Sequence, residues 1–469
     1  MRPVLAHRQF EARMGAIGMA AMVGLLVFFS GLTYWQVFRG DLANDPRNPR
    51  VLAAFTSPGR GRILDREGSE LAASSPSGTR HYTDASVAHA VGYLDARFGS
   101  QGAELAFNAA LSGAAGGSWE AAFNSEFRRT ATKGLDVRLT IAPSVQAAAA
   151  KALGSRNGAV VAIDPRNGEV LAMVSVPTYD PGALGTKGEA LLADPNSPLL
   201  NRAAQGVYPP GSTFKVVTAT SLFENGVITP GTTVTCSGQV VIDGFPVSCG
   251  NVVQGPGTYP FRNAFTFSVN AIFAEIGVKL GWEHLLASAE KFGFGSALPF
   301  TLDTAPTQVH AANSKLTKTL LASTAFGQGE ILATPLQMAL VAAAVANGGV
   351  LESPHLGFET RDGQRVVQKL EAPSGRRVMS SDVAKTMREL MVSVVDNQQA
   401  AGATIPGIKV GGKTGTAETG SGTSHAWFIA FAPAENPTIV VAVIVENGGR
   451  GGEVASPIGG SVIRAALGK

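Results

Sequence analysis

The sequence contains few groups that bind metal ions or nucleic acid. Its 469 residues include two cysteines and seven scattered histidines, without an H-E-x-x-H or C-x-x-C motif, so no metal site is predicted. The 38 basic and 35 acidic residues leave a net charge of +3, too small to indicate nucleic acid as a partner. Charged residues make up 16% and hydrophobic residues 45% of the chain, which favours large packed cores over long disordered segments. We expect neither a metal nor another cofactor.

Long hydrophobic runs are also scarce, because a single segment, Met14 to Phe38, is long enough and free enough of charge to cross a bilayer. Arginines at positions 2, 8 and 13 precede it, which favours a cytoplasmic N-terminus, and Tyr34 and Trp35 lie near its far end. The alternatives are a cleaved signal peptide, whose small-residue cleavage site is poorly matched, and a buried helix. We favour an uncleaved anchor at residues 14–38, with residues 1–13 in the cytoplasm and the later residues outside it, in a single-pass protein of the cell membrane.

The two cysteines, Cys236 and Cys249, flank a segment that reads as a tight hairpin, residues 240–247. A hairpin would bring the two flanking strands together, and an oxidising compartment would then allow a disulfide. Two free thiols are the alternative, and the sequence does not decide between them.

The rest of the chain divides into two kinds of sequence. Residues 39–134 carry no plausible catalytic constellation, and we interpret them as a small, extended α+β pedestal. Within it, Arg60 and Arg62 either pair with Glu104 or are solvated. From residue 135 onward the pattern predicts a strand at Val137–Ile141, a helix at 143–153 and a hairpin at 159–174 whose arms are apolar on both faces.

The stretch Val207-Tyr-Pro-Pro-Gly-Ser-Thr-Phe-Lys215 is the first candidate catalytic motif. Two prolines and a glycine end any helix or strand that precedes them, and a helix-compatible run begins at Ser212. Ser212 and Lys215 lie three residues apart and therefore share a helix face. A serine nucleophile needs a base within hydrogen-bond reach, and a desolvated lysine can lose its proton and serve as that base. A helix N-cap serine with a surface lysine is the alternative for this motif alone.

The second candidate motif is Ser268-Val269-Asn270, followed by a helical run from 271 to 280. In an extended or looped backbone the serine and the asparagine point the same way. The hydroxyl can relay a proton between a lysine and a leaving amine, and the amide can donate to and accept from a peptide backbone. Taken alone, the tripeptide is equally compatible with an ordinary turn.

The third candidate motif is Lys413-Thr414-Gly415-Thr416, which opens three predicted antiparallel strands ending near residue 446. Glycines at 411, 412 and 415 weaken a purely structural strand but allow another backbone to approach closely. An edge strand that binds a peptide by β-augmentation needs that access. The lysine and the threonine hydroxyls suit a substrate carboxylate; a Gly-rich turn with an exposed lysine is the alternative.

The three motifs S-x-x-K, S-x-N and K-T-G, in this order, are typical of penicillin-binding proteins and class A β-lactamases. The sequence resembles a class B penicillin-binding protein of the compact penicillin-binding protein A type. Further likenesses are Asn201-Arg-Ala203 before the first motif, Asn48-Pro-Arg50, and Arg60-Gly-Arg-Ile-Leu-Asp-Arg-Glu-Gly68 in the pedestal. Two departures, Val269 in place of the aspartate of class A β-lactamases and Ala142 in place of a common aspartate, affect no catalytic role.

The resemblance implies an α+β (α/β) transpeptidase domain over residues 135–469, with an antiparallel sheet covered by helices. It implies a D,D-transpeptidase that cross-links peptidoglycan stem peptides through an acyl-enzyme on Ser212 and that β-lactams acylate. Lys215 would be the base, Ser268 and Lys413 would protonate the leaving amine, and Asn270 would hold the peptide. The oxyanion hole would be formed by the backbone N–H groups of residues 212 and 416. The substrate-binding residues would be Thr414, Gly415 and Thr416.

The resemblance also implies partners: stem peptides ending in D-Ala-D-Ala, the cytoplasmic membrane, and a multi-pass glycan polymerase, since no second catalytic domain precedes residue 135. A carboxypeptidase, a β-lactamase, and a scaffold or sensor without turnover are the alternative functions. A sensor would need a cytoplasmic signalling domain, and an idle scaffold is expected to have lost one of the motifs. We therefore favour the transpeptidase, in cell-wall synthesis during growth or division.

Overall fold

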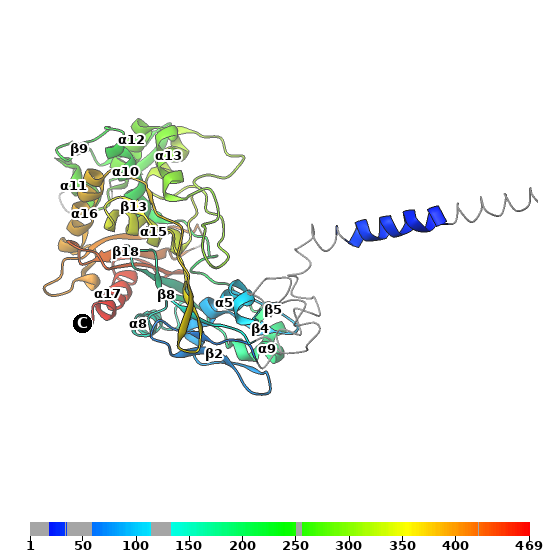
Figure 1. The fold of residues 1–469 in the computed structure, drawn as a ribbon. Coiled ribbons are helices and arrows are strands. Elements are labelled where there is room, and N and C mark those ends of the chain that lie inside the picture. The colour runs from blue at the N-terminus through cyan, green and yellow to red at the C-terminus, as the bar shows by residue number, and fades with distance from the viewer. Residues whose placement is uncertain (1–17, 33, 35–58, 114–132, 250–255, 421) are drawn as a thin grey trace, which may run out of the picture.

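The structure is a computed structural model that describes residues 18–32, 34, 59–113, 133–249, 256–420 and 422–469 (Figure 1). Residues 18–32 are helical. Within the described ranges, however, no helix has both the length and the apolar character needed to cross a membrane. The remainder of the expected anchor, residues 14–17, 33 and 35–38, and the expected cytoplasmic segment 1–13 lie outside the described residues.

A five-stranded antiparallel sheet lies at the centre of the fold. Its strand order is β17-β18-β19-β7-β8, so that β17, which carries the third motif, is an edge strand. Both the hairpin near residues 159–174 and the three consecutive strands after residue 410 were expected from the sequence. The strands are β7 (Gly158–Ile163), β8 (Val170–Val176), β17 (Gly411–Ala417), β18 (His425–Ala432) and β19 (Ile439–Val445).

Helices cover both faces of this sheet, as the apolar strands predicted. On one face α8 (Pro143–Leu153) and α17 (Ala455–Ala466) pack against residues such as Phe428. On the other face α15 (Pro335–Ala346), which is buried along its whole length, packs in the core that contains Trp427. Successive residues of β18 thus enter different cores, which is why its sequence is apolar at nearly every position.

A group of helices lies between β8 and β17 in the sequence and carries the first two motifs. They are α9 (Leu184–Ala193), α10 (Lys215–Glu224), α11 (Phe261–Thr266), α12 (Asn270–Leu280), α13 (Trp282–Phe292), α14 (Lys318–Ala325) and α16 (Ser381–Asp396). Helix α10 packs against α12, α13 and α16, and α16 packs in turn against the edge strand β17. This packing brings all three motifs to one region of the molecule.

The hairpin expected at residues 240–247 is formed by β10 (Gln239–Ile242) and β11 (Phe245–Ser248), which pair antiparallel around an Asp-Gly turn. In the structure a disulfide joins Cys236 to Cys249 across the base of this hairpin, with the Cα atoms 6.4 Å apart. The neighbouring strands β9 (Thr233–Cys236) and β12 (Gly257–Pro260) also pair antiparallel.

A second, six-stranded sheet has the order β15-β14-β6-β1-β2-β3. Its strands are β1 (Ile63–Leu64), β2 (Glu70–Ser74), β3 (Arg80–Tyr82), β6 (Asp136–Leu139), β14 (Gly357–Asp362) and β15 (Arg365–Lys369). Strand β6 pairs parallel with β1 and antiparallel with β14. The sheet therefore combines strands from both sides of the domain boundary that we expect between residues 134 and 135, and that boundary stays a prediction. Shorter elements are α4 (Ala88–Val91), β4 (Leu94–Asp95), β5 (Gly99–Ser100), α5 (Gly102–Ala106), α6 (Asn108–Leu111), β13 (Val350–Leu351) and β16 (Arg376–Arg377).

A buried cluster of charges holds the pedestal segments together. Arg60 Nη2 lies 2.7 Å from Glu104 Oε2, and Arg80 Nε lies 2.6 Å from Oε1 of the same carboxylate. All three side chains are almost fully buried, so each charge depends on its partners. The sequence left open whether Arg60 and Arg62 pair with Glu104 or are solvated. Arg60 does pair with Glu104. Arg62 pairs with Asp136 instead, at 2.7 Å, and its side chain is more exposed.

Candidate active site

Ser212 lies in a 3₁₀ turn, Gly211–Phe214, immediately before α10 rather than inside the helix as the sequence pattern predicted. The turn requires a glycine at position 211, because its φ angle is +54° and a Cβ atom there would lie 3.0 Å from the carbonyl oxygen of Thr416. The nucleophile turn and strand β17 are therefore in direct contact. Ser212 is partly exposed, and a substrate can reach it.

The opposite side of the turn also depends on a glycine, Gly327, which belongs to a family likeness, Gly327-Gln-Gly-Glu330, to which the sequence alone assigned no role. A Cβ atom on Gly327 would lie 1.8 Å from the carbonyl oxygen of Gly211, and the φ angle of Gly327 is +86°. Next to this glycine, the Ala325 carbonyl accepts a hydrogen bond of 2.8 Å from Thr218 on α10. The end of α14 and the residues after it thus pack against the nucleophile turn and α10. This close packing explains the glycine at position 327, and motif spacing alone does not indicate it.

Lys215 is the first residue of α10, and its side chain is completely buried. Its Nζ donates to the Ser268 carbonyl oxygen at 2.7 Å, to Ser268 Oγ at 3.0 Å and to Asn270 Oδ1 at 2.6 Å. The Nζ atom of Lys215 therefore joins the first and second motifs. No hydrogen bond to Ser212 is among the contacts of this nitrogen in the described part of the chain.

Ser268 lies between α11 and α12 with a φ angle of +60°, a left-handed conformation that is costly for a serine. This backbone directs its Oγ to two lysines, because Lys413 Nζ also donates to Ser268 Oγ, at 3.0 Å. The sequence predicted that Ser268 and Asn270 point the same way, and both indeed contact Lys215. They do so from a left-handed residue and the first residue of a helix, not from an extended strand.

The two lysines are buried close to one another, and burial is the main influence on both. Desolvation, and after it the nearby charge of Lys413, holds the pKa of Lys215 well below its usual range. Desolvation lowers the pKa of Lys413 to about 7. Both effects disfavour the charged form, and two adjacent buried cations also repel each other.

Strand β17 forms the other side of the site. Gly415 faces the nucleophile turn, where a Cβ atom would lie 3.0 Å from the Pro210 carbonyl oxygen. Thr416 is exposed and Thr414 is partly exposed, so their hydroxyls are accessible along the free edge of the sheet. Lys413 is fully buried and also donates to the Thr414 carbonyl at 3.0 Å. Its ammonium thus contacts the second motif as well as its own strand.

A hydrogen-bonded network beyond these motifs holds the segment that leads into the nucleophile turn. Glu446 follows β19, and its Oε1 accepts from Tyr208 Oη at 2.7 Å and from Arg202 Nε at 2.8 Å. Trp427 Nε1 donates to the Pro209 carbonyl at 2.9 Å. The sequence analysis quoted Arg202 and Tyr208 only as likenesses and missed Glu446, because no local pattern relates positions 244 residues apart.

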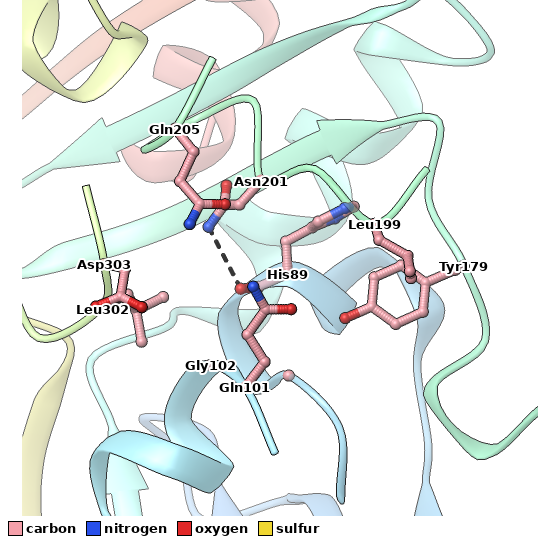
Figure 2. Close-up of a pocket in the computed structure, with 10 residues that line it drawn as sticks. His89, Gln101, Gly102, Tyr179, Leu199, Asn201, Gln205, Leu302 and Asp303 are labelled. Carbon is pink, nitrogen blue, oxygen red and sulfur yellow. Dashed lines mark hydrogen bonds between the residues drawn. The ribbon is translucent and has the colours of Figure 1, made fainter. Parts of the chain in front are cut away.

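A small cavity lies at the junction of α4, the start of α5 and the segment from residue 199 to residue 205, which precedes the first motif (Figure 2). His89 lines it, and its Nε2 lies 2.9 Å from the Pro198 carbonyl oxygen. Asn201 Nδ2 lies 3.4 Å from the His89 carbonyl oxygen (Figure 2). Burial lowers the pKa of His89 to about 4, so this histidine is neutral. The cavity contains none of the motif residues, and we assign it no catalytic part.

The described residues contain no group of three or more histidine, cysteine, aspartate or glutamate side chains that is arranged to hold a metal ion.

A serine on a turn before a buried lysine, with a second serine bridging that lysine to another, defines a serine acyl-transfer site of the S-x-x-K class. The sequence profile of the penicillin-binding protein transpeptidase domain matches residues 158–464. The peptidoglycan D,D-transpeptidase PbpA of Mycolicibacterium smegmatis is 36% identical over 488 aligned residues, which cover 96% of this chain and 98% of the relative. The chain belongs to the penicillin-binding protein transpeptidase family.

Solved structures agree with this assignment. Penicillin-binding protein A from M. tuberculosis, as a ceftriaxone acyl-enzyme complex, superimposes with a TM-score of 0.81 at 33% identity, over 89% of this chain and all of the other. Its imipenem acyl-enzyme complex gives a TM-score of 0.80 at the same identity and coverage of this chain. The resemblance to a class B protein of the A type, and the transpeptidase fold that it implies, are confirmed.

Proposed function

We propose that this protein is a peptidoglycan D,D-transpeptidase that cross-links stem peptides through an acyl-enzyme on Ser212 and that β-lactams acylate at the same serine. The observation that carries the proposal is the contact of Ser268 Oγ with both Lys215 and Lys413, each at 3.0 Å. Relatives of nearly the same length named as D,D-transpeptidases, and related structures solved as β-lactam acyl-enzymes, support it.

The reaction begins with attack of Ser212 Oγ on the carbonyl carbon of the penultimate D-Ala. Neutral Lys215 accepts the serine proton as the new C–O bond forms. Collapse of the tetrahedral intermediate breaks the peptide bond, and Ser268 passes a proton to the departing amine of the terminal D-Ala while Lys413 replenishes the hydroxyl. An amine from a neighbouring stem peptide then attacks the acyl-enzyme and gives its proton to Lys413 through Ser268. The ester bond to Ser212 breaks, Lys215 returns its proton to Ser212 Oγ, and the cross-link is formed.

Substrate contacts follow from the same geometry. Asn270 Oδ1 accepts from Lys215, so its Nδ2 is the atom that can donate to a peptide carbonyl. The backbone N–H groups of Ser212 and Thr416 form the oxyanion hole in this proposal, supported by the close approach of Gly211 to Thr416. Donors of this type contribute about 3–4 kcal/mol each in other acyl-transfer enzymes.

The threonines of β17 bind the substrate carboxylate in this proposal. Replacing both Thr414 and Thr416 by Val keeps the shape and β-propensity of the strand but removes both hydroxyls. A lost hydrogen bond to a charged group costs about 1–3 kcal/mol, so each lost hydroxyl should lower the second-order acylation rate constant roughly ten- to hundredfold, and the double variant should lose more than either single variant. The melting temperature should barely change, because these hydroxyls are accessible to water. A large drop in melting temperature with an unchanged rate would instead give this strand a purely structural role.

The two lysines should make acylation depend on pH in a bell-shaped manner. Lys215 acts as a base only when neutral, and its lowered pKa makes it neutral in more acidic solution than an ordinary lysine. Lys413 must keep its proton, and its pKa is about 7. The rate constant should therefore rise from acid pH as Lys215 deprotonates and fall above about pH 7 as Lys413 deprotonates. A rate that still rises between about pH 7 and pH 9 would contradict these roles.

The membrane anchor at residues 14–38, the boundary of the pedestal at residue 134 and a glycan-polymerising membrane partner belong to the same proposal. The anchor is supported by the charge-free segment before the folded region, and the pedestal boundary and the membrane partner are supported by the resemblance to class B penicillin-binding proteins. Cell fractionation of full-length protein and of a variant without residues 1–38 tests the anchor: the full-length protein should sediment with membranes, and the shortened one should stay in solution and still react with penicillin.

A further inference from the structure

Tyr208, Arg202 and Glu446 form a contact that we call the Glu446 clamp. Glu446 Oε1 accepts both from Tyr208 Oη, at 2.7 Å, and from Arg202 Nε, at 2.8 Å. Arg202 is almost fully buried, and its two Nη atoms donate to the carbonyl oxygens of Ser197 and Asn196 at 3.0 and 2.7 Å. The carboxylate thus holds the segment before the nucleophile at two points.

The clamp connects the two sides of the active site. Glu446 continues from β19, and its own N–H donates to the Asn157 carbonyl at 2.8 Å, next to the start of β7, so its position follows the sheet. Tyr208 belongs to the segment that carries Ser212. Through β18, β19 is linked to β17 and its Thr416. The clamp therefore influences the separation of Ser212 from Thr416.

The chain between Tyr208 and Ser212 is stiff enough to transmit that position. Pro209 and Pro210 each fix one backbone angle, and the Pro210 carbonyl also accepts from Thr213 Oγ1 at 2.6 Å. The Tyr208 backbone forms hydrogen bonds with Ala333 in both directions, at 3.0 and 2.9 Å. These contacts restrict the conformations that are open to the chain between Tyr208 and Ser212.

The tyrosine hydroxyl is suited to this contact. Burial first, and then the Glu446 carboxylate, raises the pKa of Tyr208 far above its usual range, so the hydroxyl keeps its proton and donates. The ring packs edge-on against His425 and Trp427, with centroid separations of 5.5 and 6.2 Å. Ring packing remains in a phenylalanine variant, and the hydrogen bond alone is lost.

We propose that Glu446, acting through Tyr208, is a positioning residue for the nucleophile and sets the separation between Ser212 and the oxyanion donor on β17. The inference rests on the proposed function. It concerns a residue that contacts neither the substrate nor the reacting atoms, and it predicts an effect on the acylation step rather than on binding or folding.

The test measures the first-order acylation constant, the noncovalent dissociation constant for a chromogenic cephalosporin and the melting temperature of the full chain. In Tyr208→Phe we expect the acylation constant to fall about tenfold, with dissociation constant and melting temperature nearly unchanged. Glu446→Asp keeps the negative charge opposite Arg202, but its side chain is one methylene shorter and cannot reach Tyr208 Oη as closely. The acylation constant should therefore fall by a similar factor. The double variant should lose no more than either single variant, because both remove one contact.

Tyr179→Phe is the matched control, since it removes another buried tyrosine hydroxyl. This hydroxyl donates to the Ala88 carbonyl at 3.3 Å, and Tyr179 lines the small cavity that contains His89. It should leave the acylation constant unchanged. A wild-type acylation constant in Tyr208→Phe, additive losses in the double variant, or an equal loss in Tyr179→Phe would overturn the inference. If the unmodified protein itself failed to react, the proposed function would fail instead.

Discussion

Ser212→Ala should abolish covalent labelling by a fluorescent penicillin. The variant removes the only atom to which the acyl group attaches in the proposed reaction, whereas the 3₁₀ turn around it is held by Gly211, Thr213 and the supporting segment at Gly327. Removal of the nucleophile of a serine hydrolase costs about a millionfold in rate. Labelling should therefore fall to background, as read by gel fluorescence.

Ser461→Ala is the control for this experiment. Ser461 lies in a partly exposed position on α17, where its hydroxyl donates to the Pro457 carbonyl at 2.9 Å, and its loss should leave labelling unchanged. The melting temperature of Ser212→Ala should stay close to that of the unmodified protein. Persistent labelling of a folded Ser212→Ala protein would mean that the nucleophile lies elsewhere.

Lys215→Arg should be nearly as damaging as the loss of the serine. A guanidinium does not give up its proton at any accessible pH, so the variant is always charged at this position and cannot act as the base. General-base catalysis contributes about 10²- to 10⁴-fold, and we expect the second-order acylation rate constant to fall within that range. Stopped-flow measurement with a chromogenic β-lactam gives this rate constant.

Two further variants keep the Lys215 experiment decisive. Arginine is larger than the fully buried lysine that it replaces, so Lys215→Met, which is unbranched and uncharged, checks the result in a protein without a steric clash. Lys279→Arg, on the exposed face of α12 where Lys279 pairs with Glu275 at 2.7 Å, should behave as the unmodified protein. Near-normal acylation by both Lys215 variants would exclude this lysine as the base.

The sequence predicted the elements that hold the site more accurately than the conformation of the site itself. Apolar runs and turn residues located the hairpin β7–β8, the three strands β17–β19 and helix α8, whose predicted range, 143–153, is the observed one. Motif spacing singled out Ser212 and Lys215 as candidates, and motif order grouped them with the distant third motif, Lys413 to Thr416, because that order is characteristic of the family.

What the sequence did not predict depends on contacts between distant segments. The left-handed φ angle of Ser268 has no signal in composition, since serine does not favour that conformation. The fit of Gly327 against Gly211 depends on the packing of two segments that no local pattern relates. Nor does any periodicity indicate that the six-stranded sheet would pair β6, just after the expected pedestal, with β1 inside it.

The central claim, transfer of an acyl group from Ser212 to an amine, is tested most directly with nascent, uncross-linked peptidoglycan as substrate. Mass spectrometry of the digested product gives the number of cross-links, and an enzymatic assay gives the D-Ala released. We predict cross-linked dimers with one D-Ala released for each cross-link, and neither product with Ser212→Ala or after penicillin treatment. Release of D-Ala that leaves shortened, uncross-linked peptides would identify a carboxypeptidase and contradict the account.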